Sequence, residues 1–223
     1  MKKIILSLIA LAYFNAGICQ NKDSDLKIIE AFYQGDAGNC ASISSIKLAI
    51  ATYGTNKVFL DVKHSDESCK ILMRDSTRIS ITNTELKSMD SKQNRFEKKN
   101  DNEIYDYAVF LYAVMAKNKQ IKENIRNIKK ANRYYQWGFI PTSIHLLSES
   151  TEKNLEYLGL KRFYEKINKS EVENRNKIII TSTKHSVYAT NGYYDHLGEI
   201  EPVTKYSTNY GSINEKLNYV LKK

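Results

Sequence analysis

Apolar residues recur at helical spacing in two segments of the chain. The first segment follows Cys40 and ends naturally at Gly54, and its apolar positions are Ile43, Ile46, Ile50 and Tyr53. The second begins near Asn100, and its apolar positions are Ile104, Tyr107, Ala108, Leu111, Tyr112 and Met115. Both patterns predict helices with one apolar face. A looser pattern over residues 154–167 predicts a further, mostly helical stretch.

Alternating apolar and polar residues predict short strands in two other regions. The first group of strands covers residues 58–63, 69–74 and 77–82, with a hairpin turn at Asp75 and Ser76. A polar linker precedes the second group, which covers residues 177–182, 185–190, 200–206 and 217–223, with a turn near 194–199. Helices come early and strands late, so the sequence predicts an α+β fold in two lobes.

The first twenty residues differ from the rest of the chain. Two lysines precede an apolar run from Ile4 to Phe14, and small residues follow. The run is too short to span a bilayer and is typical of a secretory signal peptide. We expect cleavage after Cys19; a lipid anchor on Cys19 is the competing interpretation, although Ile18 is bulkier than such a site prefers. The sequence therefore predicts a secreted or periplasmic protein with residues 21–223 as its domain.

The chain is basic as well as long enough for a substantial core. It has 223 residues, of which 42% are hydrophobic, and a formal charge of +9. Loss of residues 1–20, which hold two lysines and no acid, would lower +9 to +7. Basic residues are densest at 117–133, where seven Lys and Arg face one Glu. This segment is suited either to an anionic partner or, as we favour, to a solvated helix face with Ile121, Ile125 and Ile128 turned inward.

Cys40 and Cys69 remain after signal cleavage, and in an exported protein they are free to form a disulfide. Such a bridge would remove any thiol chemistry at Cys40. Alternatively, Cys69 is a small buried hydrophobe on a strand. The residues before Cys40, "YQGDAGN", favour a reactive thiol, because a disulfide does not require a glutamine and two glycines at these positions.

Cys40 stands where a helix begins, a position at which unpaired N–H groups favour a thiolate. Gly35 and Gly38 allow a tight turn before it. The Gln34 amide and the Cys40 N–H would form an oxyanion hole, worth on the order of 3 kcal/mol per donor. His185 is the predicted base, because it opens a strand far from Cys40 in sequence. The other histidines fall in a polar loop, on a helix and in a predicted turn: His64, His145 and His196.

The stretch "QGDAGNC" before an apolar helix resembles the Gln-Gly-x-x-Gly-x-Cys signature of calpain-type, papain-like cysteine proteases. The order Cys40, His185, Asn209 agrees with that family, since Asn209 to Gly211 is similar to its Asn-Pro-Trp-Gly segment with one residue missing. The resemblance extends over most of residues 33–211. The chain departs from the family pattern at Ala41, where the family has Trp.

The resemblance implies a papain-like two-lobed fold and a cysteine endopeptidase of the calpain type. Residues 21–168 would form the helical lobe that carries the nucleophile, with an inserted hairpin near 58–82, and residues 178–223 the β lobe. Cys40 would attack the peptide, Gln34 would hold the oxyanion, His185 would transfer protons, and Asn209 would orient His185. Asp195 and Glu201 are alternatives for the orienting residue. The protein is expected to act as a monomer on a protein or peptide substrate, with no cofactor, metal, nucleic acid or membrane span.

Two other functions are also compatible with the sequence. One is a papain-like domain that has lost catalysis and binds a peptide in its cleft. The other is a basic protein that binds the cell envelope and holds a Cys40–Cys69 disulfide.

Overall fold

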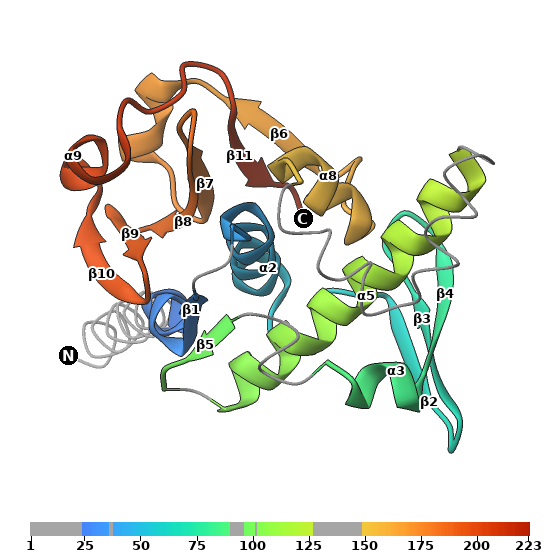
Figure 1. Cartoon of the computed structure of the whole chain (residues 1–223). Coiled ribbons are helices and arrows are strands. Elements are labelled where there is room, and N and C mark those ends of the chain that lie inside the picture. The colour runs from blue at the N-terminus through green and yellow to red at the C-terminus, as the bar shows by residue number, and fades with distance from the viewer. Residues whose placement is uncertain (1–23, 36–37, 90–95, 101, 127–148) are drawn as a thin grey trace, which may run out of the picture.

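The computed structural model describes residues 24–35, 38–89, 96–100, 102–126 and 149–223. Its fold is mixed α+β with antiparallel sheets, which confirms the predicted class (Figure 1). Residues 24–31 are helical. The other described helices and 3-10 turns are α2 (Cys40–Tyr53), α3 (Asn83–Lys87), α5 (Asn102–Arg126), α8 (Thr151–Tyr157), η2 (Lys169–Asn174), η3 (Val203–Lys205) and α9 (Tyr206–Tyr210).

The described strands form three sheets. A two-stranded sheet contains β1 (Phe32–Gln34) and β5 (Phe96–Lys98), and a three-stranded sheet contains β2 (Asp61–His64), β3 (Ser68–Leu72) and β4 (Arg78–Thr82). The largest sheet has six strands in the order β10-β9-β8-β7-β11-β6. Its members are β6 (Tyr164–Ile167), β7 (Ile178–Thr181), β8 (Ser186–Thr190), β9 (Tyr193–His196), β10 (Glu199–Pro202) and β11 (Asn218–Leu221).

Helix α2 lies at the centre of the molecule (Figure 1), and its residues 41–52 are all buried. It packs against β8, α8 and α5, so even its polar side chains are enclosed. These polar groups have partners: Ser45 Oγ donates to the Ala41 carbonyl at 2.7 Å, and Ser42 Oγ donates to Asn154 Oδ1 at 2.8 Å. The sequence predicted that one face of this helix would be buried, whereas the structure buries the helix on every side.

The predicted hairpin is confirmed in the three-stranded sheet. Its turn includes Ser76 at φ 67°, and the Met73 N–H donates to the Thr77 carbonyl at 2.9 Å. Side chains alternate along β3 and β4 as the period of a strand requires. The side chains that point inward belong to the same hydrophobic core as those of α5; they are Cys69, Ile71, Ile79 and Ile81.

Three segments differ from the sequence prediction. Residues 164–167 form β6 rather than helix, because Gly159, at φ 74°, follows the end of α8 and the chain then pairs with β11. Residues 203–206 are helical rather than extended, because β10 ends at Pro202, whose φ of −65° suits the residue that precedes a helical turn. The expected turn near 194–199 is present at Leu197 and Gly198, but His196 ends β9 rather than lying in the turn.

The basic segment is described only up to residue 126, where it forms the second half of α5. Its lysines there are paired with acids: Lys117 with Glu85 at 2.6 Å, and Lys119 with Glu149. Lys122 lies between two further carboxylates. These ion pairs favour a structural role for the described part of the segment over anion binding, but its lysines are largely buried, so it is not the solvated helix face that the sequence predicted.

The predicted signal peptide, the Cys19 anchor, His145 and residues 127–133 lie outside the described residues. Within the part of the chain that the structure describes, no helix has the length and apolar character needed to cross a membrane. The prediction of no membrane span agrees with this finding.

Candidate active site

Three residues singled out from the sequence line one small cavity: Gln34, Cys40 and His185. Its volume is about 10 Å³, close to the minimum that one water molecule requires. The other lining residues are Ile43, Ser44, Ser186, Val187, Asp195 and Leu197. The structure thus brings an amide, a thiol and an imidazole from three parts of the chain to a space that holds a single oxygen atom.

Each of these residues stands at the end of an element. Gln34 is the last residue of β1, which pairs with β5 so that Gln34 faces Phe96. Cys40 is the first residue of α2, and His185 directly precedes β8, which packs against α2. A backbone hydrogen bond from Ser186 reaches the Cys40 side chain. The segment that carries the imidazole is therefore in contact with the thiol.

The turn between β9 and β10 closes the cavity on another side. Leu197 and Gly198 have φ 52° and 84°, as in the two-residue hairpin turns with positive φ at both positions. A Cβ on Gly198 would lie 3.0 Å from the Tyr33 ring, and the Gly198 N–H donates to Asp195 Oδ1 at 2.7 Å. Because Tyr33 precedes Gln34 in β1, this close approach fixes the β9–β10 turn relative to the side of the cavity that Gln34 lines.

Burial raises the pKa of the half-buried Cys40 thiol above its ordinary value of 9.0. Backbone hydrogen bonds from Ser186, Ala41 and Cys40 itself stabilise the thiolate and lower the pKa, but burial is the larger effect. The helix N-terminus was expected to favour a thiolate. The resting thiol is instead neutral at pH 7, because withdrawal from water outweighs the N–H groups.

His185 is half-buried, and burial lowers its pKa below 6.5. The negative charge of Asp195 opposes this shift, and His196 adds to it. The imidazole is therefore neutral at pH 7 and is able to accept the proton of the Cys40 thiol. The resting pair is a thiol and an imidazole rather than two ions.

This charge state predicts the pH dependence of Cys40 alkylation. We expect the rate of alkylation by iodoacetamide to rise continuously with pH and to level off only above pH 9.0, because the thiol pKa is raised. The ability of His185 to accept the thiol proton should be lost only below pH 6.5, where the imidazole itself takes up a proton. Mass spectrometry of the peptide that contains Cys40, after timed labelling, measures the first profile. A labelling rate that stays constant down to about pH 4 would show an ion pair and contradict this expectation.

The His185 ring stacks on Tyr210, with ring centroids 4.1 Å apart and planes 26° from parallel. Its main chain is also held, since the His185 N–H donates to Ser182 Oγ at 3.1 Å and its carbonyl accepts from the Tyr206 hydroxyl at 3.3 Å. Tyr210 ends α9 and lies between Asn209 and Gly211, in the stretch that is similar to the Asn-Pro-Trp-Gly segment. The sequence did not predict its contact with His185.

The candidates for orienting His185 are engaged elsewhere. Asn209 lies near His185 on a shared hollow, but its amide donates to the Tyr194 hydroxyl at 2.6 Å. Asp195 accepts from the buried Lys47 ammonium at 2.7 Å, and Glu201 pairs with Lys205 at 2.9 Å. Of these, Asp195 lines the cavity with His185 and acts on its charge. The orienting role of Asn209 stays a prediction.

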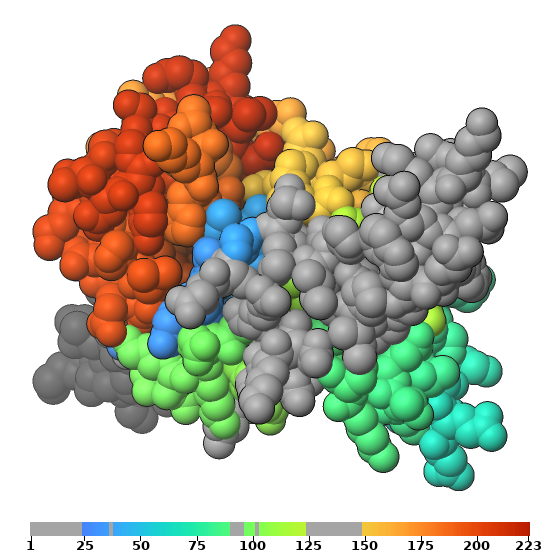
Figure 2. Space-filling view, viewed as in Figure 1, coloured from blue at the N-terminus to red at the C-terminus, as the bar shows by residue number. Residues whose placement is uncertain are grey.

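A larger groove of about 410 Å³ opens beside Cys40 and His185. Most of its lining side chains are small or carry hydroxyls; they include Gly38, Ala41, Ser150, Thr151, Ser182, Thr183 and Ser186. In Figure 2, atoms coloured as α2 (light blue) reach the surface between the orange to red strands and the yellow α8 region. An extended chain lying in this groove would pass directly over the thiol.

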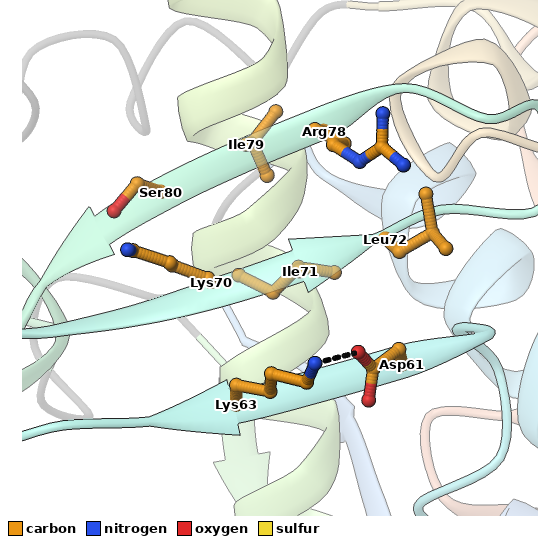
Figure 3. A pocket seen from close by; sticks show the side chains of 8 residues that line it. All are labelled: Asp61, Lys63, Lys70, Ile71, Leu72, Arg78, Ile79 and Ser80. Carbon is orange, nitrogen blue, oxygen red and sulfur yellow. Dashed lines mark ion pairs between the residues drawn. The ribbon is translucent and has the colours of Figure 1, made fainter.

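A separate open hollow lies on the outer face of the three-stranded sheet (Figure 3). Its charged residues are Asp61, Lys63, Lys70 and Arg78, and Lys63 pairs with Asp61 at 3.4 Å. It contains no cysteine or histidine, so it offers no nucleophile with a base. Among the described residues no group of three His, Cys, Asp or Glu side chains is arranged to hold a metal ion.

The two described cysteines are both free thiols. Cys69 is fully buried in β3 within the core, whereas Cys40 stands at the cavity. Cys69 thus fits the interpretation of a small buried hydrophobe rather than a disulfide partner.

Comparison of the chain with protein-family models, with curated proteins and with solved structures finds no match.

Proposed function

We propose that the protein is a cysteine peptidase that hydrolyses peptide bonds through a Cys40 acyl-enzyme. The observation that carries this proposal is the shared cavity of Gln34, Cys40 and His185. A nucleophile, a base and an amide donor around a space of one oxygen atom are the groups that acyl transfer requires. The resemblance to calpain-type, papain-like proteases assigns these same residues to the same roles.

The architecture fits the papain-like arrangement that we propose. Cys40 opens a central helix, and His185 comes from an antiparallel sheet packed on that helix. We take residues 21–168 as the lobe that carries the nucleophile, 178–223 as the β lobe, and the β2–β4 sheet as an insertion in the first lobe. Residues 1–20 would direct export as a signal peptide, and the mature protein would act as a secreted or periplasmic monomer.

In the proposed mechanism, Cys40 Sγ bonds to the carbonyl carbon of the peptide while its proton passes to a ring nitrogen of His185. The carbonyl oxygen becomes an oxyanion in the small cavity, where the Cys40 N–H and the Gln34 amide donate to it. Collapse breaks the C–N bond, and His185 gives its proton to the leaving amine. Water, deprotonated by His185, then attacks the thioester and releases the carboxylic acid and the free thiol.

Selective alkylation tests this proposal. Iodoacetamide should label Cys40 and leave Cys69 unlabelled in the folded protein, because Cys69 has 0% exposure. Hydrolysis of fluorescently labelled, denatured casein should fall in proportion to the labelled fraction of Cys40. Intact mass and peptide mapping measure the labelling. Full hydrolysis with Cys40 completely alkylated would refute the proposal.

A second candidate is a papain-like domain without catalysis that binds a peptide in the groove. The raised pKa of Cys40 and the very small cavity are the observations that favour it. In that case no reducing buffer would give casein hydrolysis, and Cys40→Ala would bind peptides as well as the unaltered protein does.

A further inference from the structure

We propose that His196 is a positioning residue for His185 and acts through the ring of Tyr210. The inference rests on the proposed peptidase site, in which the His185 imidazole must face the Cys40 thiol. It adds a residue to those that the sequence suggested for orienting His185, which were Asn209, Asp195 and Glu201. It connects His196, at the end of β9, with His185, just before β8, through one tyrosine.

The geometry of the three rings supports this connection. Tyr210 stacks on His185 at 4.1 Å between centroids, and its hydroxyl lies 2.9 Å from His196 Nδ1. His196 ends β9, and β9 pairs with β8, which follows His185. The Tyr210 side chain is therefore held at both ends, at its backbone by α9 and at its hydroxyl by His196 of β9.

The stack is the contact that fixes the His185 ring plane. Within the described residues, the hydrogen bonds of His185 involve its main-chain N–H and carbonyl, not its ring nitrogens. One ring face lies against Tyr210, which leaves the ring nitrogens available for Cys40 and for proton transfer. The orientation of the imidazole thus depends on where the Tyr210 ring is held.

The hydroxyl is the end of the Tyr210 side chain that His196 holds. Burial raises the pKa of Tyr210, so its hydroxyl keeps its proton and forms a hydrogen bond with His196 Nδ1 at 2.9 Å. Tyr194 and Tyr206 pack around the Tyr210 ring, with centroids 6.1 Å and 5.5 Å away. Without the His196 bond, the Tyr210 ring would keep its neighbours but lose the contact that sets its tilt.

Alkylation of Cys40 measures this effect without any peptide substrate. At pH 7, His196→Ala and Tyr210→Phe should each slow alkylation by about threefold to tenfold, as expected for one neutral hydrogen bond. The double variant should be no slower than either single variant, because both remove the same bond. His196→Asn, whose side-chain amide takes the place of Nδ1, should restore the rate to within about twofold. Tyr193→Phe, an exposed tyrosine on β9, is the matched control and should leave the rate unchanged.

The background His185→Ala separates positioning from a general structural role. In that background, His196→Ala should cause no further loss of alkylation rate. In hydrolysis, kcat should fall with KM unchanged, since the substrate groove is untouched. Additive effects in the double variant, or an undiminished effect in the His185→Ala background, would overturn the inference. A protein that follows the alkylation pattern but hydrolyses nothing would retain this inference and refute the peptidase.

Discussion

Cys40→Ala is expected to abolish peptide hydrolysis, with a loss in kcat/KM of at least about ten-thousandfold. The thiol is the group that forms the acyl bond in the proposed mechanism, and no other described cysteine stands near the cavity. The loss should appear in kcat rather than KM, because alanine leaves the groove intact. Initial rates of casein hydrolysis over a range of substrate concentrations measure both parameters.

Cys69→Ala is the matched control for this variant. Cys69 lies in the core of the three-stranded sheet, so its loss should cost about 1 kcal/mol of stability and leave hydrolysis within about twofold. Urea denaturation measures the stability of both variants. The assigned nucleophile would be wrong if Cys40→Ala retained hydrolysis, or if Cys69→Ala lost hydrolysis while remaining fully folded.

Lys47→Met is expected to destabilise the fold by about 3–5 kcal/mol, the range found when one partner of a buried ion pair is removed. Lys47 lies on α2 with 0% side-chain exposure, and its ammonium is 2.7 Å from Asp195 on β9. It also donates to the Ile29 carbonyl at 2.8 Å and lies over the Phe32 ring. Methionine fills the space but leaves the Asp195 carboxylate buried without its cation.

The double variant Lys47→Met with Asp195→Asn distinguishes charge from packing. The asparagine oxygen still accepts the Gly198 N–H, so the double variant should recover most of the lost stability. Lys63→Met is the control, because Lys63 forms an exposed ion pair whose loss should change stability by less than about 0.5 kcal/mol. Equal urea midpoints for Lys47→Met and Lys63→Met would contradict the role of the buried pair.

Local patterns predicted the elements that carry the reactive groups. The run of apolar residues after Cys40 predicted α2, and the alternation after His185 predicted β8, because both depend on neighbours within one element. The Asn191–Gly192 pair, with φ 54° and 81°, makes the tight hairpin between β8 and β9. That dipeptide is a known hairpin signal and was present in the sequence, so the strand β9 was predictable.

The contacts that complete the site are not encoded locally. The Lys47–Asp195 pair joins residues 148 positions apart, and β1 finds its partner β5 across some sixty residues. Strands β1 and β5 are each too short to show a clear alternation of apolar and polar residues. The pKa of Cys40 was likewise inaccessible, because the helix N-terminus is visible in the sequence whereas the burial that outweighs it arises from β8 and its neighbours.

The position of β11 in the large sheet has a consequence for how the protein matures. This strand follows every other strand in the chain, yet it lies between β7 and β6 and pairs with both. During synthesis the six-stranded sheet therefore stays incomplete until residues 218–221 have left the ribosome. In a nascent chain the Cys40 thiol would therefore be made long before the sheet that positions the His185 imidazole is complete. We expect the two groups to come together only when β11 pairs with β7 and β6.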